Sequence, residues 1–205
     1  MNNVLPFNQA SFTSDDIILL DTSFILNSLG YNNNVSLESE CNSLIASISM
    51  ANAICCIPQI AKTELLHIIK SGIFKKNGYD TENKIKILRD SNPILFQQIY
   101  GQAQSSVDSY FNTLYNNEII FPKGVGNLDE ELFELSKKIA DDFMMQGTYD
   151  SVLIATAVKE KINYIATTDK DFCNINIKNL NILLDSGNYR KHYNLNNVQT
   201  IREYK

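Results

Sequence analysis

The sequence lacks the segments that carry a chain into or across a membrane. Its first residues, MNNVLPFNQASFTSDD, contain neither a basic stretch nor an apolar one, so no secretory signal peptide is expected. No apolar run of about 18 residues, the least that a transmembrane helix needs, occurs in the chain. We therefore expect a cytoplasmic protein with no membrane partner.

Cysteine and histidine are scarce. The four cysteines form no CxxC pair, and Cys55 and Cys56 lie in the apolar run AICCIP, which favours buried reduced thiols over disulfides or zinc. His67 and His192 are the only histidines, and no HExxH motif is present. The sequence therefore indicates neither a zinc protease nor a Ser-His-Asp or Cys-His enzyme.

Positive charge is also in short supply, since the net charge is −5 over 205 residues. This balance argues against indiscriminate nucleic-acid binding, because Lys and Arg make the phosphate contacts. It suits a site that concentrates carboxylates around a cation. The apolar content of 44% is ordinary for a folded domain, and the length allows one sizeable core with an insertion.

Short apolar runs alternate with helical patterns along the chain. The runs have the length of buried strands and lie at 17–20, 53–57, 118–122, 164–167 and 180–184. Helices are expected between them, including 36–50 and a helix from Pro58 that ends at Gly72. Gly147 is expected to separate two later helices. This alternation predicts an α/β fold, a three-layer α/β/α sandwich with a central parallel sheet.

One domain, residues 1–205, is predicted. Its core lies at about 17–72 and 118–185, and residues before this core form a polar lead-in. A helical insertion occupies about 73–117, and a polar tail without a clear period occupies 186–205. No repeat or low-complexity linker marks a second domain.

Four acids lie at places that a parallel sheet brings to one edge. Asp21 and Asp169 follow strands, Glu64 lies on the helix after the second strand, and Asp150 opens a helix. Each alone has an ordinary explanation, such as an N-cap for Asp21 or a solvated helical face for Glu64. Gathered together they repel, by about 4 kcal/mol for two unit charges about 4 Å apart. We therefore expect a cation among them, and oxygen ligands favour Mg²⁺ or Mn²⁺.

Three blocks, LLDTSFIL, IPQIAKTELL and YDSVLIATAVKEKINYIATTDKDF, resemble the PIN domain, particularly the ribonuclease toxins of bacterial toxin–antitoxin pairs. The resemblance covers roughly 17–66 and 149–184, but not the middle of the chain. It implies a PIN-like sandwich in which Asp21, Glu64, Asp150 and Asp169 are the catalytic, metal-binding acids. Ser23 matches a small polar residue that supports the site. Asp171 matches a position that is often acidic but less directly involved in the site.

The resemblance also implies a function: a metal-dependent endoribonuclease that hydrolyses RNA phosphodiester bonds, either a toxin of a toxin–antitoxin pair or a related RNA-processing nuclease. Its implied partners are RNA, a cognate antitoxin and a second copy of the chain. The alternative is a non-catalytic PIN-like module that binds protein or RNA. A concentration of positive charge is either an RNA-contacting strip or a solvated helical face: Lys70, Lys75, Lys76, Lys84, Lys86 and Arg89.

Overall fold

The chain forms two compact units, which are described separately. The computed structural model describes residues 3–120, 122, 125–145, 148–193 and 200–204. The sheet unit comprises Met1–Lys62 and Glu118–Lys205, and the helical unit comprises Thr63–Asn117. The helical unit begins inside a helix and takes in more of the chain than the insertion expected at 73–117.

A five-stranded, all-parallel sheet forms the centre of the sheet unit, in the order β1-β5-β4-β2-β3. The strands are β1 Val4–Pro6, β2 Ile17–Leu20, β3 Ile54–Cys56, β4 Tyr164–Thr167 and β5 Asn181–Leu184. In β2, β4 and β5, three successive residues are buried, as expected for strands covered on both faces. The predicted α/β class with a central parallel sheet is confirmed.

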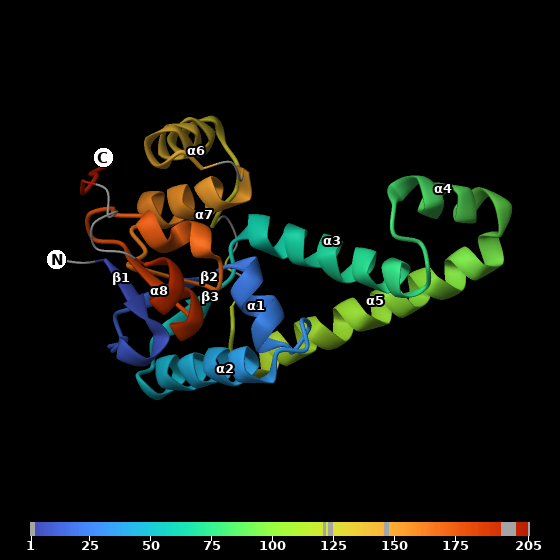
Figure 1. Cartoon of the computed structure of the whole chain (residues 1–205), viewed down its shortest axis with the longest axis horizontal. Helices are drawn as coiled ribbons and strands as arrows, with labels where there is room; N and C mark the ends of the chain where they lie inside the picture. Colours follow the sequence, from blue (N-terminus) through green and yellow to red (C-terminus); the bar gives the residue numbers. More distant parts are fainter. Residues whose placement is uncertain (1–2, 121, 123–124, 146–147, 194–199, 205) are drawn as a thin grey trace. The chain divides into compact units, whose positions relative to one another are not determined.

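Helices of the sheet unit pack on these strands and on one another (Figure 1). They are α1 Thr22–Ser28, α2 Val35–Met50, α6 Glu130–Phe143, α7 Thr148–Lys159 and α8 Ser186–His192, with 3-10 turns η1 Phe7–Gln9 and η2 Lys170–Asn174. Helix α7 contacts β4, α6 packs on α7, and α2 contacts both α1 and β3. Among the described residues, no helix is both long and apolar enough to cross a membrane.

Two expectations about strands were wrong. The N-terminal lead-in contains β1, an edge strand that pairs only with β5; three residues ending in Pro6 are too short to show a sequence pattern, and proline is tolerated at an edge. The described part of 118–122 is not a strand but a single bridge from Ile120 to Cys56. Glu118 has φ of 59°, which interrupts an extended chain. Phe121 and Gly147, which were also part of the predictions, lie outside the described residues.

Two further expectations, about where a helix ends and about the C-terminal tail, were also wrong. Helix α3, Gln59–Lys76, continues through Gly72, because a glycine inside a helix costs only about 1 kcal/mol. The supposed tail contains α8, and further on Arg202 bridges Ile177. Tyr204 donates from its hydroxyl to Asp142 Oδ2 at 2.8 Å. Helix α8 and residues 200–204 therefore belong to the folded unit.

The helical unit contains most of α3 together with α4 Glu82–Ser91 and α5 Pro93–Asn116. Thr81 and Asn92 accept capping hydrogen bonds at the starts of α4 and α5. A small core of Phe74, Leu88 and Ile99 holds these helices together. Partly buried apolar residues such as Ile85 and Leu95 pack against this core, and the unit has no sheet of its own among its described residues.

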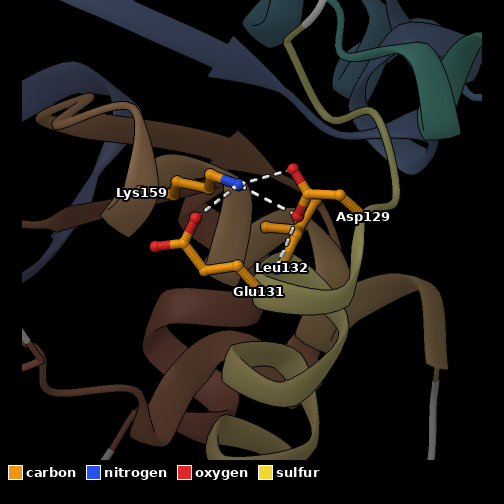
Figure 2. A network of polar contacts seen from close by, with 4 residues as sticks. All are labelled: Asp129, Glu131, Leu132 and Lys159. Atoms are coloured by element: carbon orange, nitrogen blue, oxygen red, sulfur yellow. Dashed lines mark hydrogen bonds and ion pairs between the residues drawn. The ribbon is translucent and has the colours of Figure 1, made fainter.

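One end of the α6–α7 pair is fastened by an ion-pair network (Figure 2). Lys159, in the last turn of α7, lies 2.8 Å from Asp129 Oδ2 and 3.1 Å from Glu131 Oε2. Asp129 also caps α6 by accepting the Leu132 N–H at 2.8 Å. These contacts hold the start of α6 beside the end of α7. The opposite end of the pair carries Phe143 and Asp150.

Candidate functional site

Asp21 is a buried carboxylate at the carboxyl end of β2. Its side chain is 7% exposed, and it occupies the N-cap position of α1 without making a side-chain capping hydrogen bond. Instead Oδ2 accepts from Ser23 Oγ at 2.5 Å and from Thr167 Oγ1 at 2.7 Å. The explanation of Asp21 as a helix cap therefore does not account for its side chain, which faces the end of β4.

The electrostatics at Asp21 are unfavourable for a charged carboxylate. Burial raises its pKa above the ordinary value of 3.8, hydrogen bonds from Ser23, Thr167 and the Thr22 backbone oppose this rise, and the negative charge of Asp169 adds to it. Among the described residues, no cationic side chain is a cause of the shift. Asp21 thus lies close enough to Asp169 for repulsion, and hydroxyl groups are its described side-chain donors.

Thr167 joins these two acids. Its side chain is fully buried; Oγ1 donates to Asp21 and accepts the Asp169 backbone N–H at 2.9 Å. Asp169 in turn caps η2 by accepting the Asp171 N–H at 2.9 Å. The strands β2 and β4 are paired neighbours. Asp21 and Asp169, which follow them, therefore lie at the same edge of the sheet, where the sequence predicted them.

Thr168, next in the chain, is held from both sides. Ser23 Oγ accepts its backbone N–H at 3.1 Å, and Asn27 donates to its hydroxyl at 2.9 Å. Asn188, on α8, donates to its carbonyl at 2.7 Å and to Asp185 Oδ2 at 2.8 Å. The turn that carries Asp169 is therefore fixed by α1 on one side and α8 on the other.

Asp185 and Asn188 are site-edge residues that the sequence analysis missed. Asp185 follows β5, is 5% exposed, and caps α8 through the N–H groups of Gly187 and Asn188. The signal was present: Ile182-Leu183-Leu184-Asp185 repeats the pattern of Ile18-Leu19-Leu20-Asp21. A third acid thus follows a third adjacent strand of the same edge.

Asp150 and Asp171 line a pocket of about 480 Å³ in the sheet unit. Asp150 lies in the first turn of α7, half-buried, and Asp171 lies exposed in η2. Lys170, Cys173 and His192 line the same pocket. Asp150 therefore faces the segment that follows Asp169, and the pocket opens beside the turn that Thr168 anchors.

The remaining predicted residues belong to the helical unit. Glu64 lies half-buried on α3, so the sheet unit contains three of the four predicted acids. Most of the predicted RNA-contacting cations are exposed, but several already have partners: Lys84 pairs with Asp80 at 2.7 Å, Arg89 pairs with Asp90 at 3.1 Å, and Lys70 lies over the Tyr100 ring. The set also contains Lys75, Lys76 and Lys86, which are exposed.

Carboxylate and hydroxyl oxygens converge at this edge, and such oxygen donors are the ligands that a hard divalent cation accepts. Asp169, Asp171 and Asp185 all lie near enough to Cys173 to help burial raise the pKa of that thiol to about 11. In the described part of the chain, however, no three His, Cys, Asp or Glu side chains are grouped so as to hold a metal ion. The edge concentrates negative charge without a closed set of ligands.

Comparison with known proteins adds no relative. No family model matches the sequence, and no curated protein or solved structure matches it either.

Proposed function

We propose that this chain is a PIN-like endoribonuclease that hydrolyses RNA phosphodiester bonds with Mg²⁺ or Mn²⁺. The observation that carries the proposal is Asp21: a carboxylate that is 7% exposed, repelled by Asp169 and, among the described residues, supplied with neutral donors. Burying such a group costs free energy unless a positive charge accompanies it. A bound divalent cation would offset that cost. This is the reason to assign Asp21 to a metal site and not to a purely structural role.

The chain's own residues have separable tasks in this proposal. Within the sheet unit, Asp21, Asp150 and Asp169 would hold the ion. Ser23 and Thr167 orient Asp21 by donating to Oδ2, while Thr167 also fixes the backbone of Asp169. When bound, the ion supplies Lewis-acid stabilisation of phosphoryl charge and a nucleophile at neutral pH.

Cleavage of a mixed-structure RNA by the purified chain with Mn²⁺ or Mg²⁺, beside Asp150→Asn, tests the proposal. We expect metal-dependent cleavage that the variant loses, with a single-stranded DNA of the same sequence as comparison. Calorimetric titration with Mn²⁺ distinguishes the metal-dependent nuclease from the alternative, a non-catalytic interaction module. A chain that neither cleaves nor binds the ion contradicts the nuclease and leaves the non-catalytic interaction module.

The partners follow from the same resemblance. As a toxin of a toxin–antitoxin pair, the chain would be neutralised by a cognate antitoxin and would form a homodimer. Light scattering at micromolar concentration measures the second point directly, and a monomeric mass would contradict it.

A further inference from the structure

Helix α8 lies at the acidic edge, although its side chains add little to the core. None of its seven residues is fully buried, and Tyr189 packs only partly against the core of the sheet unit. An isolated helix of this length is not stable in water, so polar contacts with its surroundings decide its position. That position matters for the site, because Asn188 on α8 donates to the carbonyl of Thr168, the residue before Asp169.

Two carboxylates accept the N–H groups at the start of α8. The first backbone N–H groups of a helix have no partner within the helix itself. Those of Gly187 and Asn188 donate to Asp185 Oδ1, at 3.0 and 2.9 Å. That of Ser186 donates to Glu40 Oε1 on α2 at 2.7 Å, and the Ser186 hydroxyl donates to the same oxygen at 2.5 Å. The first turn of α8 is therefore anchored both to the end of β5 and to a second helix.

The peptide group between Thr168 and Asp169 is held from two sides. Its carbonyl accepts from Asn188 Nδ2 at 2.7 Å, and its N–H donates to Thr167 Oγ1 at 2.9 Å. A peptide group is planar, so these two bonds together fix its orientation and, with it, the direction in which the Asp169 side chain leaves the turn. Asn188 donates its other amide N–H to Asp185 Oδ2 at 2.8 Å. A shift of α8 would disturb both bonds of Asn188, because they come from one rigid amide group.

We propose that Glu40 is a positioning residue of the candidate site: it holds the first turn of α8, and through Asn188 it orients the peptide group that precedes the Asp169 side chain. The role of Asp169 in ion binding rests on the proposed function. Glu40 lies half-buried on α2, and its negative charge beside the start of α8 is favourable in addition to the two hydrogen bonds from Ser186. Glu40 acts on the site through α8 and is not assigned to the ion.

Hydrogen exchange of backbone amides tests this relay in the full-length chain, in EDTA and without RNA. Glu40→Ala removes an acceptor, so the Ser186 amide should lose protection whether or not a relay exists. The relay predicts in addition that the Asp169 amide exchanges about tenfold faster, since its peptide group loses one of two anchors. The amide of Ile54, which donates to the Asp16 carbonyl at the other end of the sheet, is the reference and should keep its rate.

Two matched variants separate the hydrogen bond from other effects. Glu40→Gln keeps a carbonyl oxygen as the acceptor and should restore most of the protection of the Asp169 amide. Glu38→Ala removes the same kind of side chain from the first turn of α2, where the Glu38 carboxylate lies beside Gly30. This control should leave the exchange of the Asp169 amide unchanged.

Single-turnover RNA cleavage at saturating Mn²⁺ measures the catalytic consequence. Glu40→Ala should lower the rate constant about tenfold, because the orientation of Asp169 changes. The RNA concentration that gives half the maximal rate should stay the same, since the relay does not involve contacts to RNA. Glu40→Gln should recover most of the rate. A contact that only stabilised the fold would not change the rate constant of the folded enzyme.

Equal acceleration of exchange at Asp169 and Ile54 in Glu40→Ala would overturn the proposal, because it would show a general loss of stability. An unchanged Asp169 amide, a Glu40→Gln variant as impaired as Glu40→Ala, or normal cleavage by Glu40→Ala would each do the same. The exchange experiment needs neither metal nor cleavage, so its failure is distinguishable from failure of the nuclease. An inactive unaltered chain, together with a faster Asp169 amide in Glu40→Ala, would remove the nuclease and keep the relay.

Discussion

Thr167 Oγ1 donates a hydrogen bond of 2.7 Å to Asp21 Oδ2 across the paired ends of β2 and β4. The same oxygen accepts the backbone N–H of Asp169. One hydroxyl thus fixes two acids whose charges repel each other.

Thr167→Val, which keeps the shape and removes the hydroxyl, should lower the free energy of unfolding by about 1–3 kcal/mol, because a buried carboxylate loses a donor. It should also lower the cleavage rate, since Asp169 loses its anchor. Urea unfolding and RNA cleavage measure the two effects. Thr167→Ser restores the hydroxyl and should recover most of the cleavage; a serine variant as impaired as the valine variant would show that packing, not the hydrogen bond, matters.

Asp21→Asn should make stability less dependent on pH. Burial raises the pKa of Asp21 in the folded chain above the ordinary 3.8 that it has in the unfolded chain. Between the unfolded-state pKa and the folded-state pKa, the folded chain therefore binds more protons than the unfolded chain. The free energy of unfolding therefore falls as the pH rises through that window. The asparagine variant cannot ionise there and should lack this part of the fall, while cleavage is lost.

Urea unfolding of both proteins without metal, at several values from about pH 4 to pH 7, measures this difference. Addition of Mg²⁺ should stabilise the unaltered chain near neutral pH and leave Asp21→Asn unchanged. Parallel curves for the two proteins would show that Asp21 does not titrate in this range.

Asn188→Ala should reduce cleavage although Asn188 is not one of the acids. Its side chain joins the Thr168 carbonyl to Asp185, so its loss frees the turn that carries Asp169. Single-turnover cleavage at saturating metal measures the effect. Asn83→Ala, an exposed change on α4, is the control and should cleave normally; a stability loss in Asn188→Ala with an unchanged cleavage rate would contradict a positioning role.

Asn163→Ala should affect stability alone. The Asn163 side chain accepts the Ile17 N–H at 3.1 Å and donates to Asp16, at the opposite edge of the sheet from Asp21. Its removal leaves a carboxylate that is 9% exposed with one fewer donor, which should cost about 2–3 kcal/mol. Urea unfolding checks the cost, and cleavage per folded molecule should remain normal well below the melting temperature.

The four thiols should be inert in the folded chain. All are buried and free, and burial raises the pKa of Cys41, Cys55 and Cys56 to about 12. Reaction with a chromogenic disulfide at pH 8 should be slow until urea unfolds the chain, since the thiolate is the reactive form. Rapid modification of one thiol in the native state would show local opening at that position.

The parts of this fold that the sequence predicted are those where local pattern and tertiary environment agree. The runs that became β2 and β4 are continuous, apolar and followed by acids, so both their burial and their functional end were legible. The run at 118–122 has the same apolar character, yet Glu118 takes a positive φ, and among the described residues of the run Ile120 alone forms a bridge. The apolar character of a run does not show whether a neighbouring strand, here β3, pairs with it along its length.

The candidate site was only partly predictable for a similar reason. Asp21, Asp150 and Asp169 follow from strand and helix ends, but Asn188 acts from a helix that has no apolar period. Its role comes from where α8 lies beside the β4 turn, which depends on β5 pairing with β4. The pocket that Asp150 and Asp171 line also includes Phe143, at the end of α6, so it too depends on how α6 and η2 pack in the fold.

The order in which the chain is synthesised constrains when this edge can exist. Asp21 and its donor Thr167 are separated by 146 residues, and β1 has no partner until β5 has emerged. A nascent chain carries Asp21 early, but lacks the strand that orients it until the residues through Thr167 have been synthesised. Activity that needs both strands is therefore withheld from every truncated product that stops before β4.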